Sequence, residues 1–158
     1  MGTKERWRKT RPLPEDIEFR IKGLPRLFEE EGVLLAYLYG SFARGERGED
    51  LDLAVLPGRE NFPEIWEAVL DYLGSERFDL VNLKSAPLWF QFEIIRTGKV
   101  IYRKSIDIEN GYELRVVKMY QDREPVRRRQ HEIFKERLRT RWGCIKNPTK
   151  GSIQRCMK

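Results

Sequence analysis

Two aspartates lie two positions apart in an apolar segment of the chain. The stretch "GSFARGERGEDLDLAV", residues 40–55, places Asp50 and Asp52 where we expect a strand. Residues two apart in a strand point to the same face, so the two carboxylates project together. Neighbouring carboxylates resist joint ionisation, and a hard divalent cation such as Mg²⁺ relieves that conflict. The pair therefore indicates a metal site; the alternative is that both side chains are solvated at an exposed end of a sheet.

A third aspartate occurs in another predicted strand. The segment "RFDLVNL", residues 77–83, places Asp79 among apolar residues. A third carboxylate beside a D-x-D pair is what a two-metal site for phosphoryl transfer needs. An aspartate in a strand also has a structural interpretation, as a paired carboxylate or one at a sheet edge. We take Asp50, Asp52 and Asp79 as the candidate catalytic and metal-ligating residues.

The residues before the D-x-D pair suit a phosphate group. Gly40 and Ser41 directly follow an apolar run of strand length. Glycine allows close approach of the backbone, and the turn after it can offer N–H groups to phosphate oxygens. Arg44 and Arg47 follow in the loop, and a guanidinium group is well suited to phosphate. These four residues are our nucleotide-binding candidates, although a loop arginine is most often simply solvated.

The elements that must position these residues follow from the spacing of apolar residues. The patterns predict strands at 33–39, 50–57, 77–83 and 99–102, and helices at 15–32, 61–74 and 86–98, with further helices from residue 108 onward. This order predicts an α/β or α+β domain around one small sheet. We expect Trp66, Trp89 and Phe92 to belong to the core, because they fall on apolar helix faces.

Charge divides the chain into two parts. Residues 123–158 hold 12 Lys/Arg and 3 Asp/Glu, a net charge of +9, whereas the other 122 residues have a net charge of −3. We therefore predict a domain over residues 13–122 and a basic C-terminal helix and tail over 123–158, with the last 16 residues loose. A basic tail is typical of a solvated surface, a nucleic-acid contact or an acidic protein partner.

Composition excludes several classes of protein. Apolar residues make up 40% and charged residues 35% of the chain, as in globular domains with a highly charged surface. The longest apolar run is far shorter than a membrane span, and the first residues lack the apolar stretch of a signal peptide. We therefore expect no membrane association and a cytoplasmic location. The two cysteines, Cys144 and Cys156, have no metal-ligand spacing, and we assign no catalytic role to His131.

The combination of motifs resembles a known family. The Gly-Ser pair after one strand, the Ala-Arg-Gly loop and the D-x-D pair on the next strand look like the signature of the polymerase-β-like nucleotidyltransferase superfamily. The segment "FDLVNL" resembles that superfamily's third-aspartate strand, and "YELRVVKMYQDREP" is similar to the minimal nucleotidyltransferases that are paired with HEPN-domain toxins. Relatives usually carry a serine where this chain has Glu49, and many have a longer loop before the D-x-D pair.

The resemblance implies a polymerase-β-like fold, in which a small mixed sheet is flanked by helices and followed by C-terminal helices. It also implies a nucleotidyl-transfer reaction. Enzymes of this kind transfer AMP from ATP and release pyrophosphate, with two Mg²⁺ ions held by residues corresponding to Asp50, Asp52 and Asp79. In the toxin-linked branch the acceptor is a tyrosine hydroxyl of the partner HEPN ribonuclease, which is thereby neutralised in a hetero-oligomeric complex. Two alternatives are a non-catalytic antitoxin that masks its partner through the C-terminal helices, and a nucleotidyltransferase that acts on a small molecule or on RNA held by the basic tail.

Overall fold

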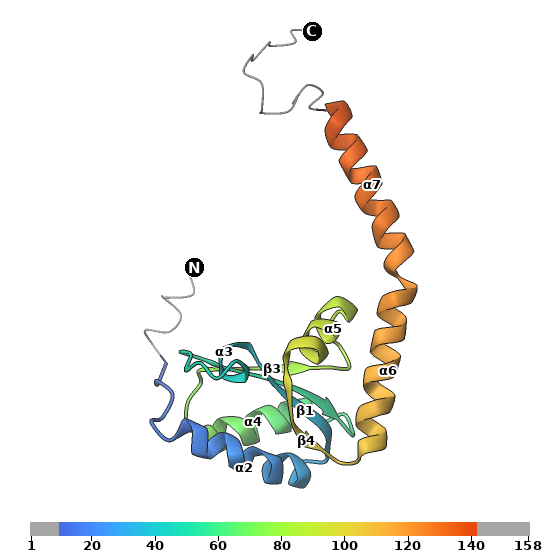
Figure 1. Cartoon of the computed structure of the whole chain (residues 1–158). Helices are drawn as coiled ribbons and strands as arrows, with labels where there is room; N and C mark the ends of the chain where they lie inside the picture. Colours follow the sequence, from blue (N-terminus) through green and yellow to red (C-terminus); the bar gives the residue numbers. More distant parts are fainter. Residues whose placement is uncertain (1–9, 142–158) are drawn as a thin grey trace, which may run out of the picture. The chain divides into compact units, whose positions relative to one another are not determined.

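The computed structural model describes residues 10–141, with side chains as far as Arg137. The chain divides between Tyr120 and Gln121 into two compact units, and Figure 1 shows the elements of each. The last 16 residues, which we expect to be loose, lie outside the described residues.

Within residues 10–141, four strands form one sheet in the order β3-β2-β1-β4. The strands are β1 (Val33–Tyr39), β2 (Leu51–Pro57), β3 (Phe78–Asn82) and β4 (Lys99–Arg103). Strand β1 is antiparallel to both β2 and β4, whereas β2 and β3 run parallel. The predicted small mixed sheet is confirmed, and it belongs to an α+β domain.

The helices alternate with the strands as the apolar periodicity predicts. The described residues contain α2 (Ile17–Glu30), α3 (Gly40–Ala43), α4 (Phe62–Leu73), α5 (Leu88–Thr97), α6 (Ile106–Asp122) and α7 (Glu124–Arg141). Proline lies at the start of α4, and Gly74 ends that helix with a left-handed φ of 66°, which is the usual asymmetry of helix ends. The single turn α3 was not predicted as a helix, because four residues are too few to show a period.

Helices cover both faces of the sheet. On one face, α2 and α4 pack against the buried side chains of Leu51, Leu53 and Val55 in β2. On the other face, α5 and α6 cover residues that include Tyr37, Ala54 and Leu56. Because β2 is buried on both faces along most of its length, a shift of its register by one residue would exchange the two sets of side chains. Packing on both faces therefore fixes the register of β2 and which of its side chains face each side of the sheet.

Two of the three aromatic residues that we expect in the core are in fact exposed. Trp66 is 38% exposed and Trp89 is 62% exposed, so the prediction is wrong for both. The periodicity locates the centre of the apolar stripe of a helix but not its edges, and each of these rings lies at such an edge. The ring of Trp66 packs on one side against Phe78 and is otherwise partly exposed to solvent. Trp89 lies in the first turn of α5. Phe92 is partly buried and packs against the core.

The second unit, Gln121–Lys158, contains the whole of the basic helix α7. Arg127 and Arg128 both bind the carboxylate of Glu124, at 2.6 and 3.1 Å. Val126, Ile133 and Phe134 are exposed. Among the described residues, no helix is both long and apolar enough to span a membrane.

Candidate active site

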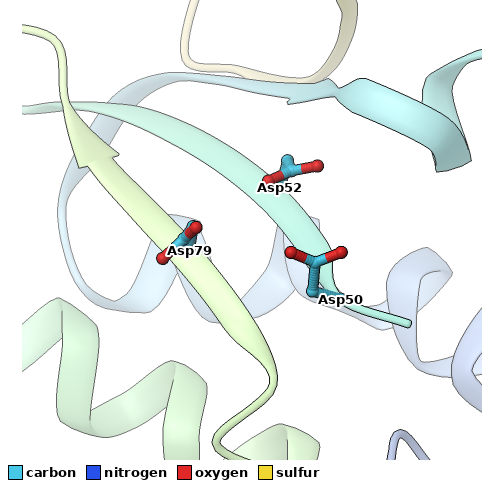
Figure 2. A group of neighbouring side chains, drawn as sticks. All are labelled: Asp50, Asp52 and Asp79. Carbon is cyan, nitrogen blue, oxygen red and sulfur yellow. The ribbon is translucent and has the colours of Figure 1, made fainter. Parts of the chain in front are cut away.

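The structure brings the three candidate aspartates together. Asp50 directly precedes β2, Asp52 is the second residue of β2, and Asp79 is the second residue of β3. The parallel register pairs Asp52 with Asp79. One carboxylate oxygen from each of the three residues lies within 4.8 Å of the others, and Figure 2 shows the three side chains gathered along these neighbouring strands. Residues 29 positions apart in sequence thus form one carboxylate cluster.

The environment of Asp52 raises the pKa of its carboxyl group to about 6. Burial is the largest cause, the negative charges of Asp50 and Asp79 add to it, and the positive charge of Arg44 opposes it. Ionisation of this group is therefore costly unless a positive charge compensates it. Carboxylate oxygens within 4.8 Å of one another are the donors that Mg²⁺ prefers. The residues present fit a divalent cation.

Gly40 approaches Asp52 closely. The backbone of Gly40 has a φ of +70°, and a Cβ atom at this position would lie 2.1 Å from Oδ2 of Asp52. Side chains do not tolerate such a contact, and L-residues rarely adopt this φ. Glycine at position 40 is thus required by the carboxylate cluster as well as by the turn from β1 into α3.

Ser41 lies in the single turn α3, which precedes the loop that leads to the cluster. Its carbonyl oxygen accepts hydrogen bonds from the backbone N–H groups of Arg44 and Glu46, each at 3.0 Å. Gly48 lies against the serine side chain, since a Cβ there would be 2.2 Å from Oγ of Ser41. Gly48 is not among the residues we selected from the sequence. The regular glycine spacing in "GERGED" is the signal from which it could have been found.

The two loop arginines have different surroundings. Arg44 is exposed, pairs with Glu46 at 3.5 Å and acts electrostatically on Asp52. Arg47 donates hydrogen bonds to the carbonyl oxygens of Pro14 and Glu15, at 3.2 and 3.4 Å. The structure therefore places Arg44 within electrostatic range of the carboxylates, whereas Arg47 joins the loop to the chain that precedes α2.

Tyr39 is a neighbour of the cluster that sequence reasoning missed. It pairs with Asp52 across β1 and β2, and Asp52 in turn pairs with Asp79. Burial and the three negative charges raise the pKa of the Tyr39 hydroxyl group, so the phenol is neutral at physiological pH. A tyrosine inside an apolar run is typical of a core residue, and only the strand register reveals that this one borders the carboxylates.

The family model described as "Polymerase beta, Nucleotidyltransferase" matches residues 23–107. This chain belongs to the polymerase beta nucleotidyltransferase family. The matched span contains all seven candidate residues, from Gly40 to Asp79.

Solved structures with the same fold come from toxin–antitoxin complexes. A chain of a toxin–antitoxin complex with AMP-PNP is 25% identical, has a TM-score of 0.58, and matches over 73% of this chain and 97% of its own length. A chain of the tri-AMPylated Shewanella oneidensis HEPN toxin in complex with MNT antitoxin is 21% identical, with a TM-score of 0.58 and coverage of 74% and 97%. A chain of an MntA–HepT toxin–antitoxin complex is 22% identical, with a TM-score of 0.57 and the same coverage. Among curated proteins, no significant match to this sequence was found.

Proposed function

We propose that this chain is an antitoxin that transfers AMP from ATP to a tyrosine hydroxyl group of a partner HEPN ribonuclease toxin. The observation that carries the proposal is the convergence of Asp50, Asp52 and Asp79 within 4.8 Å in a chain of a nucleotidyltransferase family. The likeness to a toxin–antitoxin complex that binds AMP-PNP supports the nucleotide, and the AMPylated HEPN toxin of another similar complex supports the acceptor.

The reaction is a displacement at phosphorus. The acceptor oxygen attacks the α-phosphorus of ATP and forms a new P–O bond. The bond from that phosphorus to the oxygen bridging to the β-phosphate breaks, and pyrophosphate leaves with the electron pair. The proton of the acceptor hydroxyl passes to the carboxylate of Asp79. Asp79 suits this role because it is the exposed member of the cluster, so a hydroxyl group carried by another protein can reach it.

The remaining residues hold the nucleotide. Asp50 and Asp52 would bind two Mg²⁺ ions, with Asp79 completing one site; the ions, when bound, neutralise charge on the triphosphate and on the attacking oxygen. The backbone after Gly40 and the hydroxyl group of Ser41 would contact the β- and γ-phosphates. Arg44 would stabilise the negative charge on the departing pyrophosphate, since it already acts on Asp52 electrostatically. Arg47 would hold the loop in place, because its guanidinium group binds the carbonyl oxygens of Pro14 and Glu15.

The test is a measurement of mass gain on the partner. The tagged full-length chain is purified from the cells that encode it, and the proteins bound to it are incubated with ATP and Mg²⁺. Intact-protein mass spectrometry followed by peptide sequencing should find one or more AMP units on a tyrosine of a bound HEPN protein. The double variant Asp50→Ala/Asp52→Ala should transfer none.

The matched control is Asp71→Ala, which removes an exposed carboxylate from α4, on the opposite face of the sheet. This variant should retain full transfer. Undiminished transfer by the double aspartate variant would refute the assigned ligands. A partner that is inhibited by the chain without any gain of mass would show instead that the chain acts by masking.

A further inference from the structure

An aromatic row extends from the carboxylate cluster toward solvent. Tyr39 lies beside Asp52 in the register of the sheet. The ring of Phe90 meets the ring of Tyr39 edge-on, with centroids 5.8 Å apart and an interplanar angle of 87°. The ring of Trp89 follows at 5.4 Å from Phe90. Three aromatic side chains, from β1 and from the first turn of α5, thus form a continuous path that starts at the carboxylates.

The outer end of this row is an exposed indole. Trp89 is 62% exposed, whereas Phe90 is partly buried against the core. Tryptophan is enriched at binding interfaces, because its ring is largely apolar and its N–H group can meet water or a polar partner. Because the ring of Phe90 contacts the indole, packing positions Trp89, and the exposed part of its side chain remains available to a ligand.

We propose that Trp89 is the platform on which the nucleobase of the bound nucleoside triphosphate stacks, with Phe90 and Tyr39 as the residues that position it. The inference rests on the proposed function, which supplies both the nucleotide and the assignment of Asp79 to the acceptor. Across the sheet, Asp52 of β2 lies between Asp79 of β3 on one side and Tyr39 of β1 on the other. The exposed Asp79 is assigned to the incoming acceptor, so the base extends over Tyr39 toward α5.

Stacking on an indole suits a nucleobase for a physical reason. Every base presents a flat π-face, and stacking on an aromatic side chain contributes about 1–3 kcal/mol per base. That contribution depends on the overlap of the rings and not on hydrogen-bond patterns. Inorganic tripolyphosphate carries the phosphates without a base, and it therefore separates this contact from binding at the carboxylates.

The experiment compares two probes on variants of the full chain. Isothermal titration with AMP-PNP in Mg²⁺ should give a dissociation constant about 5- to 150-fold larger for Trp89→Ala than for the wild type, as loss of one stacked base requires. Trp89→Phe should keep most of the affinity, because it retains an aromatic ring. Titration with tripolyphosphate should give the same constant for all three proteins.

Trp66→Phe is the matched control, since Trp66 is also partly exposed but packs against Phe78 on the face covered by α4. AMP-PNP should quench tryptophan fluorescence in the wild type and in Trp66→Phe, and much less in Trp89→Phe. Equal weakening of AMP-PNP and tripolyphosphate by Trp89→Ala would overturn the proposal. Unchanged AMP-PNP affinity together with a higher KM for the acceptor would also overturn it, by assigning the indole to the acceptor. The titrations and the fluorescence measurements do not depend on whether AMP transfer to the partner succeeds.

Discussion

Gly40 and Asp52 lie so close together that a Cβ atom on residue 40 would be 2.1 Å from Oδ2 of Asp52. The close contact joins the turn after β1 to the carboxylate cluster on β2. A side chain at position 40 would have to displace either the carboxylate or the turn that carries Ser41. The two halves of the proposed site, for phosphate and for cation, are therefore coupled sterically through one glycine.

Replacement of Gly40 by alanine should abolish AMP transfer, because the added methyl group forces Asp52 out of the cluster. Gly45→Ala is the matched control. Gly45 also has a positive φ, +77°, but no atom lies within 4 Å of the position of its Cβ. Backbone strain should cost both variants about 1 kcal/mol of stability, and the contact with Asp52 should add to that loss in Gly40→Ala alone. Transfer rates and urea denaturation are measured on both. Equal activity of the two variants would mean that the contact with Asp52 does not matter.

Removal of the charge of Asp52 should stabilise the protein when no metal is present. The pKa of this carboxyl is about 6 in the folded chain, above its ordinary value of 3.8, so the folded state holds its proton more tightly than the unfolded state. The wild type therefore loses stability as pH rises from about 4 to about 6, and the loss persists above pH 6. Asp52→Asn does not titrate there and lacks this loss.

In EDTA at pH 7.5, we expect the Tm of Asp52→Asn to exceed that of the wild type by about 2 °C or more. The two values should converge near pH 4. Mg²⁺ should raise the Tm of the wild type and have a much smaller effect on the variant, because binding to the folded state stabilises it. A difference in Tm that is the same at pH 4 and pH 7.5 would exclude charge repulsion as its cause.

The two loop arginines should respond differently to substitution. Arg44→Ala should slow AMP transfer on the order of 10-fold, less than the 10²–10³ lost with a preorganised oxyanion donor, because Arg44 is exposed. Arg47→Ala should mainly loosen the segment before α2, since the guanidinium binds the carbonyl oxygens of Pro14 and Glu15. Transfer kinetics and hydrogen exchange of residues 10–16 distinguish the two effects. A larger kinetic defect for Arg47→Ala would reverse this assignment.

Local patterns predict the sheet and its carboxylates well. Alternation in β2 indicates which residues face the core, and the same alternation places Asp50 and Asp52 on one side. Periodicity predicted only that the two strands belong to one small sheet. It does not show which strands are neighbours, so it did not predict that Asp52 pairs with Asp79. The family resemblance supplied that part of the prediction.

What the patterns could not predict depends on contacts between distant segments. The role of Tyr39 follows from its register against Asp52, and that of Gly48 follows from its contact with the hydroxyl group of Ser41. The exposure of Trp89 depends on where α5 begins relative to the sheet. A residue at the edge of an apolar stripe has the same sequence pattern whether it ends up covered or exposed, so this residue was wrongly predicted as core.

The hydrogen bond between Tyr37 and Glu113 should contribute more to stability than the hydrogen bond between Tyr112 and Gln91. Tyr37 on β1 is buried and donates to Oε1 of Glu113 on α6 at 2.6 Å. Tyr112 donates to Oε1 of Gln91 at 2.9 Å. The first acceptor is a carboxylate and the second a neutral amide, and a bond to a charged group contributes about 1.5–3 kcal/mol against about 0.5–1.5 kcal/mol for a neutral one.

Tyr37→Phe should therefore lower the free energy of unfolding by more than Tyr112→Phe does, as measured by urea denaturation. Both substitutions leave the ring in place, so packing changes little and the difference reports on the hydroxyl groups. AMP-PNP affinity should remain the same in both variants, because neither bond touches the carboxylate cluster. If the two variants lose equal stability, the charge of Glu113 adds nothing to the attachment of α6 to the sheet. If Tyr37→Phe also weakens AMP-PNP, the packing of α6 against β1 affects the neighbouring Tyr39 and hence the site.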